Sequence, residues 1–210
     1  MTRGKLIAFR DRVRKAWEAG IIKNPVHLPG GNENELIEIF KGIGKKDYVF
    51  CTHRNMYHAL LHGIDPSILF SEICKESSSP SYGRSGCMCI LSPEHNFYSS
   101  AIIGGNCAIA VGVAWAFRKS GDPRRVWCFI GDSVVETGHF FESLNYADCL
   151  KLPITFVIED NGRATCTSNE DRMGGFNYPE LYEFLQSELV RYYRYTPTTP
   201  HVGSGKYVAF

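Results

Sequence analysis

Long apolar runs and net charge of either sign are both missing from this sequence. No apolar stretch approaches the length that spans a membrane, and the N-terminus lacks the apolar core of a secretory signal. Lys and Arg number 23 against 22 for Asp and Glu, which gives a formal net charge of +1. A chain so nearly neutral offers no electrostatic basis for binding nucleic acid or a membrane surface. Internal repeats and low-complexity tracts are also missing, so we expect a single soluble domain over residues 1–210.

The eight cysteines do not indicate disulfide bonds. Those with apolar neighbours in the sequence, where free cysteine behaves as a small hydrophobe, are Cys51, Cys74, Cys107, Cys128 and Cys149. Cys87 and Cys89 form the one close pair, and a lone Cys-x-Cys without a second pair is a weak zinc signal. We therefore predict a reduced, cytoplasmic protein.

The two ends of the chain carry simple local patterns. Residues 1–40 are predicted to be helical, because basic and apolar side chains alternate near the N-terminus; an amphipathic helix is the first interpretation, and a targeting or contact arm is the alternative. In the tail, residues 177–210, we expect a helix from Pro179 to Leu189 and a strand from Val190 to Tyr195. The aromatic residues there either form a contact surface or cover the chain's own core; they are Tyr192, Tyr193, Tyr195, Tyr207 and Phe210.

A strand-helix-strand unit occupies the centre of the second half. Residues 125–130 (RVWCFI) and 154–158 (ITFVI) are apolar runs of strand length. Apolar residues at helical spacing between them are Phe140, Leu144 and Ala147. Such a unit favours parallel strands, and parallel sheets bind ligands beyond the carboxyl ends of their strands. Asp132 follows the first strand and Asn161 the second, so we expect their side chains to meet.

Asp132 and Asn161 have the chemistry of magnesium ligands. A carboxylate and an amide oxygen are hard donors, and magnesium takes one or two carboxylates and completes its shell with phosphate and water. The helix after Asp132 would also direct its N-terminus toward an anion there. The alternative is that Asp132 caps a helix and that Asn161-Gly162 is an ordinary turn.

The segment from Gly131 to Gly162 resembles the thiamine diphosphate motif of the alpha subunits of 2-oxo acid dehydrogenase first components. The residues that match are Gly138, Glu142, Asn145, Leu152, Pro153 and Asn161, while Glu136 fits loosely. The resemblance implies an α/β thiamine diphosphate-binding fold, with a mostly parallel, doubly wound sheet flanked by helices. It also implies that Asp132, Asn161 and the backbone carbonyl of Arg163 hold magnesium.

Two residues depart from this motif. Ser133 replaces the last glycine of the family's GDG, and Asp160 replaces the first asparagine of its NN. Neither change removes a metal ligand. Ser133 adds a side chain in the loop, with Val134, where the family's backbone lies close to the diphosphate.

Four further segments resemble the same family in the same order. Pro25–Glu33 (PVHLPGGNE) is similar to its helix-entry segment, and in CTHRNMYHALLHG the residues His53 and Arg54 fall on positions that contact the diphosphate. Arginine suits that role because its guanidinium forms charge-assisted hydrogen bonds to phosphate, although a solvated surface charge is the alternative. NFYSSAIIGGN places Ala101 and Ile103 where the family's backbone binds the aminopyrimidine ring, and it leads into an alanine-rich helix over residues 104–119.

The loop before that segment differs from the family at one position. SYGRSGCMC resembles the family's KGxGGSMH, but Cys89 stands where the family has an active-site histidine, which leaves the substrate class and rate open. The polar residues 76–86 are expected to form a mobile loop that covers the cofactor. His58 and His95 are candidates for proton transfer, although each is more readily explained as structural or solvent-facing.

The resemblance accounts for only the diphosphate-binding half of such an enzyme. It implies a beta-type partner subunit that supplies the pyrimidine-binding domain and the activating glutamate, in a heterotetramer of two plus two chains that acts on a small 2-oxo acid. The family's alpha subunits also continue further at the C-terminus. A catalytically silent relative that binds cofactor or partner and a split transketolase-like carboligase remain open, as does a different α/β fold whose magnesium binds another phosphate ligand.

Overall fold

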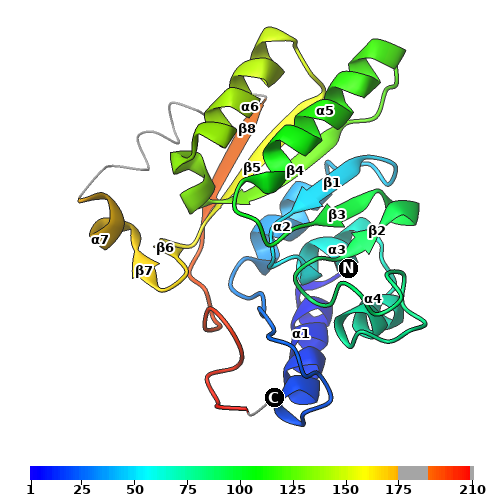
Figure 1. Ribbon diagram of the computed structural model, residues 1–210, viewed down its shortest axis with the longest axis vertical. Helices are drawn as coiled ribbons and strands as arrows, with labels where there is room; N and C mark the ends of the chain where they lie inside the picture. The colour runs from blue at the N-terminus through cyan, green and yellow to red at the C-terminus, as the bar shows by residue number, and fades with distance from the viewer. Residues whose placement is uncertain (175–188, 209–210) are drawn as a thin grey trace. The chain divides into compact units, whose positions relative to one another are not determined.

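The computed structural model describes residues 1–174 and 189–208, and the chain divides into two compact units. The first unit comprises Met1–Lys46, Cys51–Ala101 and Pro197–Phe210, and the second comprises Asp47–Phe50 and Ile102–Thr196. Figure 1 shows that the first is rich in helices and that the second contains a parallel sheet. A single folding domain over residues 1–210 stays a prediction. The expected helix from Pro179 and the aromatic Phe210 fall outside the described residues.

Four helices of the first unit bury apolar side chains. They are α1 (Arg3–Glu18), α2 (Glu33–Phe40), α3 (Met56–His62) and α4 (Pro66–Ile73). The face that α1 buries consists of Leu6, Phe9, Val13, Ala16 and Trp17, which recur at helical spacing. This confirms the predicted amphipathic helix, although the helical prediction for residues 1–40 is wrong between α1 and α2, where residues 19–32 form turns and irregular backbone. A short antiparallel pair, β2 (Leu91–Ser92) and β3 (Phe97–Ser99), joined by the 3-10 helix η1 (Pro93–His95), completes the unit.

The second unit is built on parallel strands in the order β1-β4-β5-β8. Their bounds are Tyr48–Cys51, Val126–Gly131, Ile154–Asp160 and Val190–Arg194. Every residue of β5 is buried, as is typical of a parallel strand covered on both faces. The predicted α/β class, both central strands and the strand in the tail are therefore confirmed. Helices α5 (Gly105–Ser120) and α6 (Gly138–Cys149) pack against each other, and α5 also packs on the sheet (Figure 1).

A 3-10 helix separates β4 from α6, and the sequence did not indicate it. This helix, η2, runs from Asp132 to Glu136, and its Val134 and Val135 side chains are buried. Thr137 then donates its hydroxyl to the Val134 carbonyl at 2.7 Å, and α6 begins at Gly138. The buried valines hold the chain against the sheet for one tight turn before the α-helix starts. After β5 follow the antiparallel β6 (Arg163–Ala164) and β7 (Thr167–Ser168), and α7 (Asn169–Met173).

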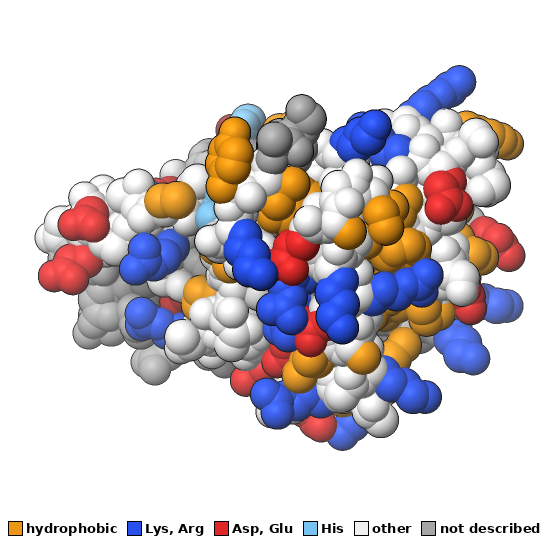
Figure 2. All heavy atoms as spheres, turned by 90° about the horizontal axis from the view of Figure 1, so that it is seen from below, with side chains coloured by type: hydrophobic (Ala, Val, Ile, Leu, Met, Phe, Trp, Pro, Cys, Tyr) orange, Lys and Arg blue, Asp and Glu red, His pale blue; other side chains and the backbone are white. Residues whose placement is uncertain are grey.

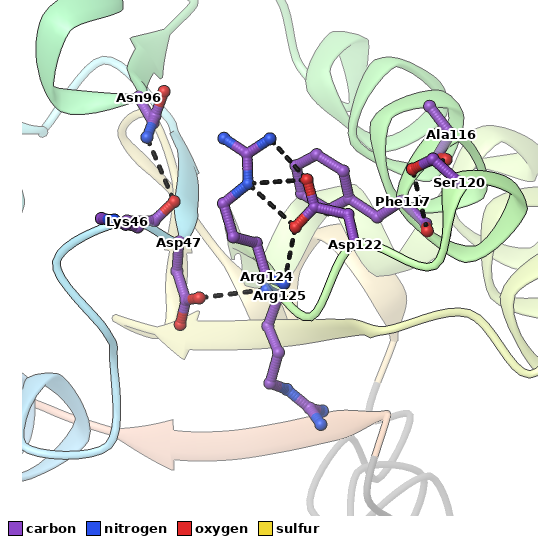
Figure 3. Close-up of polar contacts among 9 residues, drawn as sticks. All are labelled: Lys46, Asp47, Asn96, Ala116, Phe117, Ser120, Asp122, Arg124 and Arg125. Atoms are coloured by element: carbon purple, nitrogen blue, oxygen red, sulfur yellow. Dashed lines mark hydrogen bonds and ion pairs between the residues drawn. The ribbon is translucent and has the colours of Figure 1, made fainter.

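Asp47 fixes the start of β4 beside β1. Its carboxylate accepts the backbone N–H of Arg125 at 3.0 Å (Figure 3) and the indole N–H of Trp127 at 3.2 Å. Nearby, the Arg124 guanidinium forms an ion pair with the Asp122 carboxylate, with Nη2 2.6 Å from Oδ2 (Figure 3). Because Trp127 is buried, its indole N–H depends on the Asp47 oxygen.

Replacing Asp47 with alanine is expected to lower the free energy of unfolding by about 1–3 kcal/mol, the cost of leaving a buried donor without its acceptor. Urea denaturation would measure this. Asp122→Ala is the matched control, because it removes a surface ion pair and should cost less. Equal losses in the two variants would contradict a special role for Asp47.

The surface mixes charged and apolar side chains. On the face drawn in Figure 2, Lys and Arg side chains lie among acidic and apolar ones. Across residues 1–174 and 189–208, no helix combines the length and apolar content needed to cross a membrane. Large exposed apolar side chains of the second unit include Ile102, Ile103, Ile109, Trp115, Phe141 and Tyr146. Most belong to α5 and α6, so these two helices carry an apolar outer surface.

Candidate metal and diphosphate site

Acidic and amide side chains gather where β4 and β5 end. Gly131 pairs with Glu159 in the parallel register, so Asp132 lies beside Asp160 and Asn161 follows one residue later. The fold therefore brings Asp132 and Asn161 to the same edge of the sheet, because parallel neighbours end together. β6 then returns against η2, which places the Arg163 backbone at this edge as well.

Asp132 is buried in a setting that disfavours its charge. Its side chain is 2% exposed. Burial is the main cause that raises its pKa to about 6, and the neighbouring Asp160 charge raises it further. A hydrogen bond with the Asn169 side chain and the charge of Arg172 act in the opposite direction. A cation placed at this carboxylate would favour its ionised form and lower the pKa again.

Arg172 supplies the nearest positive charge. Its Nη2 lies 2.6 Å from Glu136 Oε1, 2.8 Å from Asn169 Oδ1 and 3.5 Å from Asp132 Oδ2. The sequence reasoning missed both Arg172 and Asn169. A signal was present: Ser168 caps α7 by accepting the Asp171 N–H at 3.0 Å, and this capping pattern predicts a short helix that carries Arg172.

The turn after β5 is formed by side-chain acceptors. Asn161 Oδ1 accepts the N–H of Arg163 at 2.9 Å, and Asp160 Oδ1 accepts the N–H of Gly162 at 2.7 Å. Gly162 has φ 72°, a conformation that favours glycine. The turn interpretation of Asn161-Gly162 is therefore correct, although the amide oxygen keeps a second lone pair. Asp132 is not a helix cap, because Gly131 precedes η2 and Thr137 caps α6.

The departures from the family motif have distinct surroundings. Asp160 is buried, and its Oδ2 accepts the Tyr192 hydroxyl at 2.8 Å, so its carboxylate holds the turn and the neighbouring strand together. Ser133 is half-buried beside the buried Val134. In the loop before α5, Ala101 and Ile103 are both exposed, and Ala101 belongs to the first unit. Contacts of Ser133, Val134, Ala101 and Ile103 with a cofactor stay predictions.

The Arg54 side chain is hydrogen-bonded within the first unit, so the alternative that it is a solvated surface charge is wrong. Nη1 donates to the Leu28 carbonyl at 3.1 Å, and Nη2 donates to the His201 carbonyl at 2.9 Å. His53 lies beside it, with its ring 4.8 Å from that of His27 in edge contact. The sequence reasoning did not single out His27 or His201. A diphosphate contact for His53 and Arg54 stays a prediction.

His58, His95 and Cys87 make local contacts. His58 is buried, and its ring makes an edge contact with Phe40 at 6.0 Å. His95 Nδ1 lies 2.8 Å from the Ser92 hydroxyl. Cys87 donates its thiol to the Pro25 carbonyl, and burial raises the pKa of that thiol to about 11. All eight cysteines are free. A catalytic role for either histidine stays a prediction.

The oxygen donors at the end of β4 and β5 fit magnesium. Asp132 offers a carboxylate, Asn161 an amide oxygen and Arg163 a carbonyl, all hard donors on two neighbouring strand ends. The buried carboxylates of Asp132 and Asp160 concentrate negative charge that a divalent cation would offset.

Replacing Arg172 with glutamine is expected to destabilise the metal-free chain by about 1–3 kcal/mol, because Asp132 and Glu136 lose a charged hydrogen-bond partner. The same change should enlarge the rise in melting temperature that magnesium and its phosphate ligand produce together, because the metal ion no longer competes with a guanidinium for the Asp132 carboxylate. Thermal denaturation with chelator and with magnesium would show both effects. Arg118→Gln, on an exposed arginine of α5 away from the carboxyl ends of the strands, is the control. Equal changes in stability and in the ligand-induced rise in melting temperature for the two variants would contradict a role for Arg172 at Asp132.

Comparisons with known proteins agree on one family. Residues 3–179 match the family model described as "Dehydrogenase E1 component". The chain is similar to the alpha subunit of the pyruvate dehydrogenase E1 component of Porphyra purpurea, with 35% identity over 161 residues, 73% of this chain and 47% of that protein. The corresponding subunit of Zymomonas mobilis is 31% identical over 184 residues, 82% of this chain and 52% of that protein.

A third relative carries a different name. The alpha subunit of the acetoin:2,6-dichlorophenolindophenol oxidoreductase of Cupriavidus necator is 32% identical over 183 residues, 81% of this chain and 54% of that protein. The chain therefore spans about half the length of the curated relatives it matches.

Proposed function

Because the chain belongs to the dehydrogenase E1 component family, we propose that it is the diphosphate- and magnesium-binding part of a thiamine diphosphate-dependent enzyme that acts on a 2-oxo acid. Its relatives are named as alpha subunits, and the chain is E1 alpha-like over most of its length. The observation that carries the proposal is the buried Asp132 at the strand end beside Asn161. The reaction is oxidative decarboxylation or carboligation.

The residues of the chain would bind and position the charged end of the cofactor. Asp132, Asn161 and the Arg163 carbonyl would hold magnesium, and the ion would neutralise the diphosphate together with Arg54. His53 and the backbone around Ser133 and Val134 would complete the diphosphate contacts, while Ala101 and Ile103 would contact the aminopyrimidine ring. When bound, thiamine diphosphate supplies the electron sink for decarboxylation, and the protein contributes position and charge.

A beta-type partner subunit would complete the active site. We propose that it supplies the pyrimidine-binding domain and the activating glutamate, in a heterotetramer of two plus two chains. The apolar outer surface of α5 and α6 supports a protein partner, because Trp115 is 50% exposed and Tyr146 63% exposed, and exposed aromatics favour interfaces. Tyr192 and Tyr193 instead bond to acidic groups of β5, so this part of the aromatic tail serves the chain's own sheet.

A catalytically silent relative is the second candidate. Cys89 stands where the family has a histidine, and Arg172 already provides a positive charge to Asp132. Such a protein would bind cofactor or partner without turnover. In either case we propose a reducing, cytoplasmic location, which the eight free cysteines support.

Carbon dioxide release separates the two candidates. The chain would be co-expressed with a beta-type partner, purified as a complex and supplied with thiamine diphosphate, magnesium and a panel of 2-oxo acids. Release from one acid, lost in Asp132→Ala, would support the enzyme. Bound cofactor with no release from any acid would favour the silent relative or a non-decarboxylating carboligase. Failure to bind the cofactor in the complex would contradict both.

A further inference from the structure

A groove opens at the amino ends of the parallel strands of the second unit, opposite the carboxyl ends that carry Asp132. Its volume is about 700 Å³, within the range of about 300–1,000 Å³ that holds small ligands. The residues that line it come from the ends of α5 and α6 and from the segments just before β4, β5 and β8. The length of β4 separates the groove from Asp132 by roughly 20 Å, so it is not part of the site at Asp132.

Apolar side chains form the floor of this groove. Phe117 and Leu152 are buried, and Pro153 and Leu189 add to the apolar lining. The Phe117 ring is in edge contact with the Tyr48 ring at 5.1 Å, which fixes its position. The carbonyls of Pro153 and Leu189 accept backbone hydrogen bonds from β4 and β5, at 2.8 Å and 2.7 Å. A ligand with an apolar body would lose water-exposed surface on this preformed floor, which favours binding.

Two arginines line the same groove. Arg118 is exposed in the last turn of α5, and Arg125 is exposed just before β4. Within residues 1–174 and 189–208, neither guanidinium has an acidic partner. Arg125 Nη2 donates only a long hydrogen bond of 3.4 Å to the Thr155 hydroxyl, and Figure 3 shows its guanidinium directed away from the Asp47 carboxylate. Both arginines therefore keep donors for an anionic ligand.

The two carboxylates that line the groove are already paired. Arg124 binds both oxygens of Asp122, with Nε 3.0 Å from Oδ1 and Nη2 2.6 Å from Oδ2 (Figure 3). Lys151 Nζ lies 2.9 Å from Asp148 Oδ1. Each pair offsets its own charge, so the two lining arginines give the groove a net positive charge. A guanidinium binds a carboxylate through two parallel hydrogen bonds, which fixes the orientation of the ligand.

The helices that border the groove present their carboxyl ends to it. These ends carry partial negative charge, whereas phosphate sites are built on helix N-termini and backbone N–H groups. The carbonyls at both ends are bonded within the chain. The Ser120 hydroxyl donates to the Ala116 carbonyl at 2.9 Å (Figure 3), and the Leu152 N–H donates to the Ala147 carbonyl at 2.9 Å. The groove therefore suits a singly charged anion held by arginine better than a phosphate dianion.

We propose that this groove binds a small monocarboxylate with an apolar body, such as an aromatic acid. The carboxylate accepts hydrogen bonds from Arg118 and Arg125, and the apolar body covers Phe117 and Leu152. The inference does not rest on the proposed function, because every group that carries it lies at the opposite end of the strands from Asp132.

A titration of the full chain with benzoate, followed by saturation-transfer NMR of the ligand, tests this site. Benzamide has the ring without the charge and acetate has the charge without the ring, so both should bind more weakly than benzoate. Arg118→Gln and Arg125→Gln should each weaken benzoate binding by roughly tenfold, the effect of losing one hydrogen bond to a charged group. Lys119→Gln removes an exposed charge of α5 that does not line the groove, so this control should bind as the unaltered chain does.

Other results would overturn the site. Equal affinities in Arg118→Gln, Arg125→Gln and Lys119→Gln would place the benzoate elsewhere, and no transfer of saturation to benzoate would show that it does not bind. Benzamide binding as tightly as benzoate would remove the role of the arginines, and displacement of benzoate by an equal concentration of inorganic phosphate would contradict the carboxylate class. Circular dichroism shows whether each variant is folded. Two arginines on separate elements keep the test valid if one variant is not.

Discussion

Replacing Asp132 with alanine is expected to abolish the rise in melting temperature that thiamine diphosphate and magnesium produce together. A ligand that binds only the folded state stabilises it, by about 2.7 kcal/mol at a concentration one hundred times its Kd. Asp132 is the one full carboxylate among the three proposed magnesium ligands, so its loss should remove most of the metal's affinity. Thermal denaturation with and without both ligands measures the effect.

Asp148→Ala is the matched control for this experiment. Asp148 is an exposed carboxylate on α6 that pairs with Lys151, so its removal changes net charge by the same amount at a distance from the strand ends. The control should keep the full ligand-induced shift. The measurement is made on the chain alone and on the complex with the proposed beta-type partner. A shift that survives in Asp132→Ala in both preparations would contradict the metal assignment.

Acid is expected to destabilise the metal-free chain between pH 6.5 and about pH 4 through His27 and His53. The folded pKa of His27 is about 4 and that of His53 about 3, against 6.5 when unfolded. The unfolded state therefore binds more protons in this window, so stability is fully present above pH 6.5 and falls as the pH drops. The loss from His27 alone is up to about 3 kcal/mol.

Asp132 acts in the opposite direction over part of this range. Its folded pKa is about 6, above the ordinary value of 3.8, so its contribution to stability falls as pH rises. The histidine effect is therefore measured as a difference between variants. Urea denaturation in chelator at pH 7 and pH 4.5 should show a smaller acid loss for His53→Gln than for the unaltered chain. Parallel pH dependence in the two proteins would contradict the neutral state of the His53 ring.

The elements that could be predicted from the sequence are those whose apolar residues recur at a regular spacing. The spacing of apolar residues predicts both central strands, their parallel arrangement, α5 and the amphipathic α1, because that spacing reflects which face of each element is buried. The position of Asp132 after β4 followed from the same logic. The turn at Asn161-Gly162 was also foreseeable, because asparagine and glycine favour it.

Features created by tertiary contact were not predicted. The 3-10 helix η2 has no period of its own, and the burial of Val134 and Val135 against the sheet produces it. Arg172 reaches Asp132 from 40 positions later, and His201 meets His27 only because residues 198–203 pair with residues 26–30. No local pattern in a single sequence encodes such meetings.

Phosphorus NMR of bound thiamine diphosphate with Mn²⁺ in place of magnesium tests the central proposal most directly. If Asp132, Asn161 and the Arg163 carbonyl hold the ion against the diphosphate, the relaxation rates of both phosphorus nuclei in the complex with the proposed beta-type partner should differ from those of the free Mn²⁺–cofactor complex, because the bound ion tumbles with the protein. Asp132→Ala should return the relaxation rates to those of the free Mn²⁺–cofactor complex, while Asp148→Ala should keep the rates of the unaltered protein. Equal relaxation rates in Asp132→Ala and the unaltered protein would contradict the magnesium-diphosphate role of this strand end.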